Sequence, residues 1–229
     1  MIFAAGLGTR LKPLTDTMPK ALVRVGGQPL LWHVIMKLKA AGYERMVVNV
    51  HHFADQIIDY LYSNDHFGID IRISDERDGL LETGGGIKKA LPLFDPESPI
   101  LIHNVDILSN LDLNALPTDA PLLVVSPRQT MRYLLFDDSL RLHGWTNIET
   151  GEVKGQMAEK RLAFSGIHIF HPSLIPLMAD WPDRFPIRDL YLKACGDHLI
   201  RGYEVHDLHL LDVGKLDTLE QAETFIKQL

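Results

Sequence analysis

The chain has 229 residues, of which 46% are hydrophobic and 23% charged, so it holds enough apolar material for a large core. Its formal net charge is −7, which argues against a nucleic-acid-binding surface because such a surface needs a basic face. The single cysteine, Cys195, permits no internal disulfide and suits a reducing cytoplasm. The sequence shows no signal peptide and no apolar run of membrane-spanning length, so we expect a cytoplasmic protein that binds no membrane.

The stretch Ala4–Leu22, AAGLGTRLKPLTDTMPKAL, follows an apolar strand and combines glycines with prolines and cations. The glycines let the backbone turn tightly and present bare N–H groups to an anion, and the cations suit phosphate oxygens. We therefore predict a polyphosphate-binding loop. The loop matches neither the GxxxxGK[ST] of a Walker A loop nor the GxGxxG of a dinucleotide fingerprint. Its candidate residues are Gly6, Gly8, Thr9, Arg10 and Lys20.

After this loop, apolar strands alternate with amphipathic helices. A helix is expected from Pro29 to about Ala41, because apolar residues recur there at helical spacing. A second helix is expected around Ile57–Leu61, and buried strands are expected at Met46–Val50, Ile69–Ile73 and Pro99–His103. This order is typical of an open α/β sheet with right-handed crossovers.

Three polar motifs lie beside these elements. Leu81–Lys89, LETGGGIKK, places three glycines ahead of a helix, where backbone amides can approach a ligand closely. Asn104-Val105-Asp106 ends a buried strand, and a carboxylate there lies at the crevice where parallel sheets bind ligands. Asp212-Val213-Gly214 follows a last apolar strand, Leu208–Leu211, and precedes a helix expected at Lys215–Lys227.

The region after Leu122 has a different pattern of short strands. Strands are expected at Leu122–Ser126, Tyr133–Phe136, Leu140–Trp145 and Leu162–Phe170, with a hairpin turn at Asp137–Ser139. The polar segment Thr146–Arg161 is expected to be an exposed loop, and Pro172–Met178 and Ile187–Cys195 are expected to be helical. Gly166, inside a strand, indicates the close approach of a ligand.

The opening stretch resembles the signature of the sugar-nucleotide pyrophosphorylases, GxGTRLxPLT followed by PKP, with Ala21 in place of the last proline. These nucleotidyltransferases join a nucleoside triphosphate to a sugar 1-phosphate. The resemblance implies one domain, residues 1–229, with a Rossmann-like open, mixed, mostly parallel sheet flanked by helices, of the nucleotide-diphospho-sugar transferase, glycosyltransferase-A-like type. It also implies a nucleotide-binding half, 1–110, and a sugar-phosphate-binding half, 111–229.

The resemblance further implies a Mg²⁺ cofactor and roles for individual residues. The implied catalytic residues are Arg10, Lys20 and Asp106, and the implied metal ligands are Asp106 and Asp212. The implied nucleotide-binding residues are Ala5, Gly6, Gly8, Thr9, Glu82, Thr83, Gly84, Gly85 and Asn104. The implied sugar-binding residues are Glu159, Ser165 and Gly166. The chain departs from the family where Val105 replaces a usual glycine and where Arg161 stands in place of a proline.

The motifs LETGGGI and FSGIHIFHP are similar to those of bacterial N-acetylmuramate 1-phosphate uridylyltransferases. This similarity implies UTP and N-acetylmuramate 1-phosphate as substrates, a role in cell-wall recycling, and a monomer or homodimer. The same scaffold serves mannose- and heptose-1-phosphate guanylyltransferases and glucose-1-phosphate thymidylyl- or uridylyltransferases. The short C-terminal region argues against the bifunctional acetyltransferase type. A non-catalytic nucleotide-sugar-binding protein is the alternative from another class, and the presence of both aspartates argues against it.

Overall fold

The computed structural model describes residues 1–228, which form two compact units. Unit 1 contains Met1–Leu80, His103–Ala115 and the segment that starts at His209, and unit 2 contains Leu81–Ile102 and Leu116–Leu208. These bounds differ from the halves 1–110 and 111–229, whose separate binding roles stay predictions. The predicted α/β class with a mostly parallel sheet is confirmed by the strands and helices described below.

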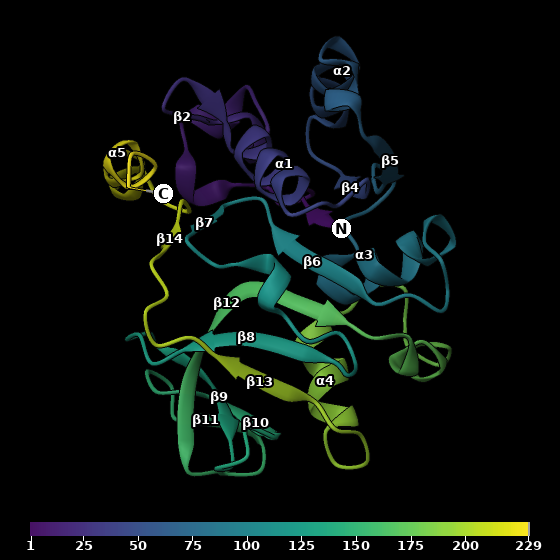
Figure 1. Cartoon of the computed structure of the whole chain (residues 1–229), viewed down its shortest axis with the longest axis vertical. Coiled ribbons are helices and arrows are strands. Elements are labelled where there is room, and N and C mark those ends of the chain that lie inside the picture. Colours follow the sequence, from purple (N-terminus) through teal and green to yellow (C-terminus); the bar gives the residue numbers. More distant parts are fainter. Residues whose placement is uncertain (229) are drawn as a thin grey trace. The chain divides into compact units, whose positions relative to one another are not determined.

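Four parallel strands follow one another in the order β6–β1–β4–β5 (Figure 1). The strands β1, β4 and β5 belong to unit 1, whereas β6 begins in unit 2 and enters unit 1 at His103. Their bounds are β1 (Ile2–Phe3), β4 (Arg45–Val50), β5 (Asp70–Asp75) and β6 (Ile100–Asn104). In register, Ile2 lies opposite Val48 on one side and opposite His103 on the other. The predicted helices are α1 (Leu30–Ala40), which precedes β4, and α2 (Ala54–Ser63), which joins β4 to β5. The core is formed by their apolar stripes against the buried strands.

Two short antiparallel pairs complete unit 1. One pair joins β2 (Arg24–Val25) to β3 (Gln28–Pro29), and the other joins β7 (Ile107–Ser109) to β14 (Leu210–Asp212). The last helix, α5 (Leu216–Phe225), is tied to the first pair, because the Gly26 amide donates a 2.8 Å hydrogen bond to the Glu223 carboxylate.

Unit 2 is a mostly antiparallel sheet with two helices (Figure 1). β9 pairs with β12 and β10, β10 pairs with β11, and β8 lies between β12 and the parallel strand β13. The strand bounds are β8 (Leu122–Ser126), β9 (Arg132–Phe136), β10 (Leu142–Asn147), β11 (Glu152–Gly155), β12 (Lys160–Phe170) and β13 (Arg201–Glu204). The helices are α3 (Glu82–Ala90) and α4 (Ile187–Ala194).

The structure of unit 2 differs from the expectations at three places. The segment Thr146–Arg161 is not wholly loop, because β11 forms there and pairs with β10 from Gly144 to Asn147. Sequence periodicity missed this strand since its residues are polar and solvent-facing, and the ladder hydrogen bonds stabilise it instead. Pro172–Met178 is helical as expected, but it forms two short 3₁₀ helices and no continuous α-helix, because Pro176 has no N–H to donate within such a helix. The strand β13 was not expected at all.

The three glycines of LETGGGI lie within α3 and not ahead of it. A Cβ at Gly84 would lie 2.2 Å from the ring of Phe185, and one at Gly85 would lie 1.9 Å from the Asp183 carbonyl oxygen. The amides of both glycines also donate hydrogen bonds to the Phe185 carbonyl. The missing side chains therefore allow α3 to pack closely against the segment 183–185.

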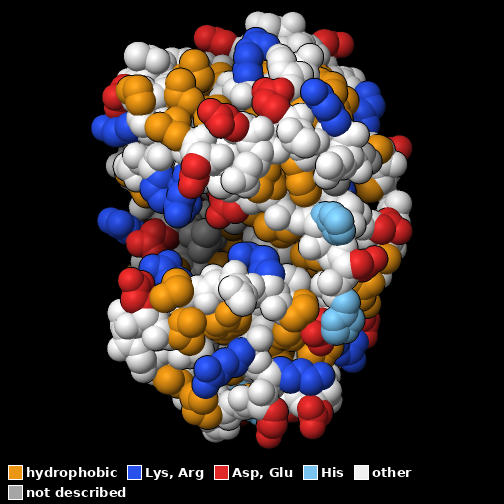
Figure 2. Space-filling view, turned by 90° about the vertical axis from the view of Figure 1, so that its left-hand side faces the viewer, with side chains coloured by type: hydrophobic (Ala, Val, Ile, Leu, Met, Phe, Trp, Pro, Cys, Tyr) orange, Lys and Arg blue, Asp and Glu red, His pale blue; other side chains and the backbone are white. Residues whose placement is uncertain are grey.

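On the face drawn in Figure 2, lysine and arginine side chains are interspersed with aspartate and glutamate, and neither sign forms a continuous patch. Within residues 1–228, no helix is both long enough and apolar enough to span a membrane.

We expect Gly85→Ala to destabilise the protein by about 1–3 kcal/mol, because its new methyl group would overlap backbone that cannot rotate away. The steric overlap should cost more free energy than the about 1 kcal/mol by which alanine stabilises a helix relative to glycine. Urea unfolding measures the free energy of unfolding of the variant and of the unmodified protein. The matched control is Gly196→Ala, whose Cβ would meet no atom within 4 Å. Equal unfolding midpoints for the two variants would contradict the packing role.

Candidate active site

The glycine loop of unit 1 is braced around Gly8. Gly8 adopts a left-handed conformation with φ of 64°, and a Cβ there would lie 2.9 Å from Thr15 and 3.0 Å from Lys20. Its carbonyl oxygen accepts hydrogen bonds from the Leu11 amide and the Thr15 hydroxyl, both at 2.9 Å. Only glycine fits this position without strain, so the loop has one defined shape. Gly6, Thr9 and Arg10 are exposed on it, whereas Ala5 is buried.

A buried polar chain anchors the start of the loop. The Ala4 amide donates a 2.7 Å hydrogen bond to the Asn49 side-chain oxygen, and the Asn49 amide group donates one of 2.8 Å to Glu76. Both side chains are buried. Sequence reasoning missed this support, although Asn49 is the one polar residue in the apolar run Met46–Val50, and such a residue needs a partner.

Lys20 and Asp106 form an ion pair at the end of β6. Lys20 is only 8% exposed, and its ammonium group donates a hydrogen bond to Asp106 Oδ2. Asp106 follows the half-buried Asn104 and the buried Val105, whose amide donates to the Phe3 carbonyl at 3.1 Å. Val105 does not adopt a positive φ, so the sequence NVD needs no glycine at its centre.

Asp212 is brought beside this ion pair by the pairing of β14 with β7. Asp212 lies opposite Ile107 in register, and the Val213 amide donates a 2.9 Å hydrogen bond to the Asp106 carbonyl oxygen. A Cβ on Gly214 would lie 2.6 Å from Asp212 Oδ1 and 2.7 Å from the Arg10 guanidinium. Unit 1 therefore gathers Arg10, Lys20, Asp106 and Asp212 from three separate stretches of sequence, which are the glycine loop, the end of β6 and the end of β14.

Four residues of unit 2, Glu82–Gly85, were expected to bind the nucleotide. In the structure, each of them makes a contact with the segment 183–187 of the same unit. Glu82 has a left-handed φ of 60° and forms an exposed 3.3 Å ion pair with Arg184. The Thr83 hydroxyl accepts a 2.9 Å hydrogen bond from the Ile187 amide. As described above, the Gly84 and Gly85 amides donate to Phe185. A strained, non-glycine residue such as Glu82 is a feature often found at functional sites.

The expected sugar-binding strand contains a bulge. The pairing of β12 with β8 shifts register between Phe164 and His168, and Gly166 has a positive φ of 83°. Ser165 is buried, and its hydroxyl accepts a 3.1 Å hydrogen bond from the Ile167 amide. The small residues thus shape the strand itself. Glu159, the third expected sugar ligand, is exposed just before β12.

The donor set in unit 1 fits a hard divalent cation. Within residues 1–228, no group of three or more His, Cys, Asp or Glu side chains is arranged to hold a metal ion. Mg²⁺ needs fewer protein ligands, because it is usually bound by one or two carboxylates together with water and phosphate oxygens. Asp106 and Asp212 supply two carboxylates and therefore fit this ion.

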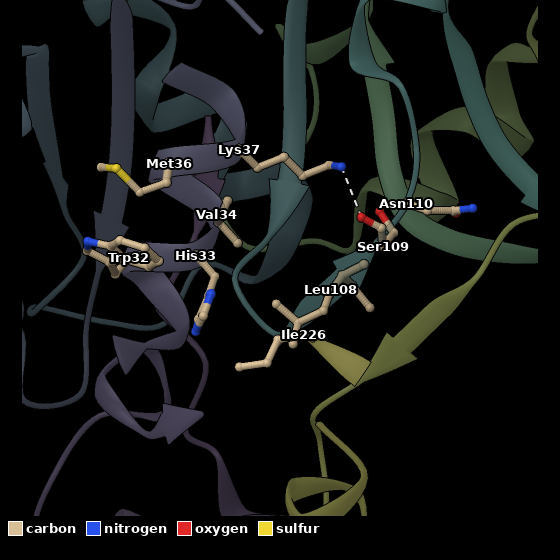
Figure 3. A pocket seen from close by; sticks show the side chains of 10 residues that line it. Trp32, His33, Val34, Met36, Lys37, Leu108, Ser109, Asn110 and Ile226 are labelled. Carbon is tan, nitrogen blue, oxygen red and sulfur yellow. Dashed lines mark hydrogen bonds between the residues drawn. The ribbon is translucent and has the colours of Figure 1, made fainter. Parts of the chain in front are cut away.

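Unit 1 also contains a pocket that none of these carboxylates and cations lines. It has a volume of ≈ 470 Å³ and is lined by α1, β7 and Ile226 (Figure 3). Lys37 lines this pocket, and its ammonium group donates a 3.0 Å hydrogen bond to the Ser109 carbonyl oxygen (Figure 3). None of the predicted site residues lines it.

Two buried histidines remain neutral in the folded protein. Burial lowers the pKa of His103, at the end of β6, to about 4, although its hydrogen bond to the Asn104 carbonyl partly opposes this effect. Burial lowers the pKa of His168, on β12, to about 3. Each imidazole is therefore uncharged at neutral pH.

Comparison with known proteins identifies the family. A family model described as nucleotidyl transferase matches residues 1–120. An N-acetylmuramate alpha-1-phosphate uridylyltransferase from Caulobacter vibrioides is 36% identical over 217 residues, which cover 88% of this chain and 86% of that protein. The chain belongs to the nucleotidyl transferase family. The predicted resemblance and the prediction of an enzyme are thereby confirmed.

Two further known proteins are similar to this nucleotidyltransferase. An enzyme of the same name from Neisseria meningitidis serogroup B is 46% identical over 116 residues, which cover 50% of this chain and 49% of that protein. The solved structure of a UDP-glucose pyrophosphorylase from Acinetobacter baumanii has a TM-score of 0.77, covering 99% of this chain and 96% of that one. At 16% identity, the latter similarity shows a shared fold.

The buried His168 makes the stability of the nucleotidyltransferase depend on pH. The unfolded chain protonates this histidine below its ordinary pKa of 6.5, whereas the folded chain resists protonation until about pH 3. The free energy of unfolding should therefore fall as the pH drops below 6.5, with a contribution from His168 of about 2 kcal/mol at pH 5.

Urea unfolding at pH 7.5 and pH 5.0 tests this expectation. The variant His168→Phe should lose about 2 kcal/mol less between these two pH values than the unmodified protein does. His103 contributes in the same direction in both proteins, so it cancels in the comparison. An identical loss in both proteins would show that His168 is protonated equally in the folded and unfolded states.

Proposed function

We propose that this nucleotidyltransferase joins UTP to N-acetylmuramate 1-phosphate and releases pyrophosphate. The name of the Caulobacter relative, which aligns over most of both chains, supports the choice of substrates. The observation that carries the proposal is the β7–β14 pairing, which holds Asp212 beside the Asp106–Lys20 ion pair.

The proposed reaction needs no covalent nucleophile. An oxygen of the sugar 1-phosphate attacks the α-phosphorus of UTP, the bond to the bridging oxygen breaks, and pyrophosphate leaves. The difficulty is electrostatic, because two anions must meet and charge builds on the leaving group. Lys20 binds the incoming phosphate, and Arg10 together with the amides around Gly8 binds the leaving pyrophosphate. Catalysis then rests on positioning and charge stabilisation.

Asp106 and Asp212 are the residues that would hold Mg²⁺. The ion, when bound, supplies partial neutralisation of the phosphate charges. The protein's own contribution is to hold the two aspartates on one paired backbone and to keep Lys20 largely desolvated in contact with Asp106.

The assignment of base and ribose recognition to Glu82–Gly85, and of sugar recognition to Glu159, Ser165 and Gly166, stays part of the proposal. Because the amides of Gly84 and Gly85 already bond to Phe185, we infer that the glycines act by close contact and that Glu82 supplies the polar contact. Cell-wall recycling, a cytoplasmic location, and a monomeric or dimeric state are likewise proposed from the sequence.

A pyrophosphate-release assay tests the substrates. It combines UTP, GTP, dTTP, CTP and ATP with the 1-phosphates of N-acetylmuramate, N-acetylglucosamine, glucose, mannose and heptose. We expect the highest kcat/KM for UTP with N-acetylmuramate 1-phosphate. A preference for GTP with mannose or heptose 1-phosphate would identify a guanylyltransferase instead, and no turnover of any pair would favour a protein that only binds nucleotide sugars.

We expect Asp106→Asn and Asp212→Asn each to reduce kcat/KM about a hundredfold, because each removes a charged group that acts in the transition state. The same assay at saturating Mg²⁺ measures the loss, and circular dichroism checks that the variants fold. The control is Asp138→Asn, which removes an equal charge from the exposed hairpin turn of unit 2. Near-normal turnover in either site variant would exclude the metal-binding role of that residue.

A further inference from the structure

The glycine loop of unit 1 is held at two points. At one end, the Ala4 amide donates to the Asn49 side chain. At the other end, the Gly8 carbonyl accepts from the Thr15 hydroxyl. Between these points, the amides of residues 5–7 have no hydrogen-bond acceptor within residues 1–228. Successive amides in such a turn can form a concave site for an anion, so the direction in which they point decides what the loop binds.

That direction is set where the chain leaves β1, because a side chain takes the place of a backbone acceptor there. On the β6 side, the Phe3 carbonyl accepts a 3.1 Å hydrogen bond from the Val105 amide. Alternate residues of a parallel strand direct their backbone groups to opposite neighbours, so the Ala4 amide is directed toward β4. Its acceptor there is Oδ1 of Asn49, at 2.7 Å, and not a carbonyl of the β4 backbone. Asn49 therefore fixes the point at which the strand ends and the loop begins.

Glu76 holds the Asn49 side chain in the orientation that this contact needs. A backbone amide only donates, so the Asn49 oxygen faces Ala4 and its nitrogen faces the Glu76 carboxylate, which accepts at 2.8 Å. The backbone of Glu76 is fixed in turn, because its amide donates to the Val50 carbonyl at 2.8 Å and its carbonyl accepts from His51 Nδ1 at 2.7 Å. The loop is thus tied through two side chains to the rigid part of the sheet.

We propose that Asn49 and Glu76 are positioning residues for the nucleoside triphosphate, which aim the amides of residues 5–7 at the phosphates that leave as pyrophosphate. This inference rests on the proposed function, because it takes the glycine loop as the polyphosphate site. Both residues are buried and act through the Ala4 amide without touching the substrate. A rotation of the backbone at Ala4 displaces every amide that follows, and a misplacement of about 1 Å in a positioning group costs up to about a hundredfold in rate.

The order of donor and acceptor in this relay can be reversed, which gives a rescue experiment. Asn49→Asp keeps the acceptor for Ala4 but brings two buried carboxyl groups into contact, which repel each other when ionised. Adding Glu76→Gln restores a donor between the two side chains. We expect Asn49→Asp to raise KM for UTP about ten- to a hundredfold, and the double variant to recover about tenfold or more of this loss. KM for N-acetylmuramate 1-phosphate should change by less than about twofold, because the loop amides do not bind it.

A second substitution and a matched control separate loop geometry from stability. Asn49→Leu removes both hydrogen bonds without adding a charge, and it should raise KM for UTP as Asn49→Asp does. The control is Val47→Ala, which truncates a buried side chain on the same face of β4. It should lower the urea midpoint and leave KM for UTP within about twofold. An equal rise in KM for UTP in Val47→Ala and Asn49→Leu would show that lost stability, and not loop geometry, weakens binding, and would refute the proposal.

Direct binding distinguishes this inference from the proposed reaction. Calorimetric titration uses pyrophosphate and UTP, each in the presence of Mg²⁺. The unmodified protein and the double variant should bind both, and the two single Asn49 variants should bind them about tenfold more weakly or worse.

The possible outcomes differ for the two claims. Binding by the unmodified protein without turnover of any substrate pair would refute the proposed reaction, while weaker binding by the Asn49 variants would still support the positioning role. Equal affinity in the unmodified protein and both Asn49 variants would refute the positioning role, whether or not turnover is present. A failure of the unmodified protein to bind either pyrophosphate or UTP would refute it as well.

Discussion

The antiparallel pairing of β14 with β7 is the constraint on which the candidate active site depends. Asp106 and Asp212 are about a hundred residues apart, and three register pairs together with the Val213–Asp106 hydrogen bond place them on neighbouring backbone. Each backbone hydrogen bond contributes only about 1 kcal/mol, but together they fix the spacing of two carboxylates that would otherwise repel each other. The hydrogen bond from Gly26 to Glu223 adds a further tie from α5.

The ion pair between Lys20 and Asp106 has an electrostatic consequence. Both side chains are largely removed from water, so each loses hydration that the other must replace. The pair remains favourable because the groups are in hydrogen-bonding contact. A phosphate that approaches Lys20 therefore competes with Asp106, and a cation that approaches Asp106 competes with Lys20. A bound phosphate would take the place of Asp106 as the partner of Lys20, and a bound cation would take the place of Lys20 as the partner of Asp106. Until then, the ion pair keeps both side chains in position.

Unit 2 shows how the same residue types can serve packing or ligands. Gly84 and Gly85 are required because α3 touches the segment 183–185, and Gly166 is required by a bulge in β12. The sequence alone assigns the glycines at positions 84 and 85 to a ligand, whereas the contacts they make in the structure are packing contacts within unit 2.

The sequence by itself determined the strand and helix order of unit 1, the glycine loop and the identity of the family, because these depend on local periodicity and on closely spaced residues. It could not give β11, β13 or the helical setting of Gly84–Gly86, since long-range pairing and packing override local preference there. Only the tertiary structure decided that Asn49 and Glu76 support the loop and that β14 pairs with β7, which gives the expected neighbourhood of Asp212 and Asp106 its backbone geometry. The physical reason is that residues distant in sequence become neighbours only when the backbone pairs and buries them together.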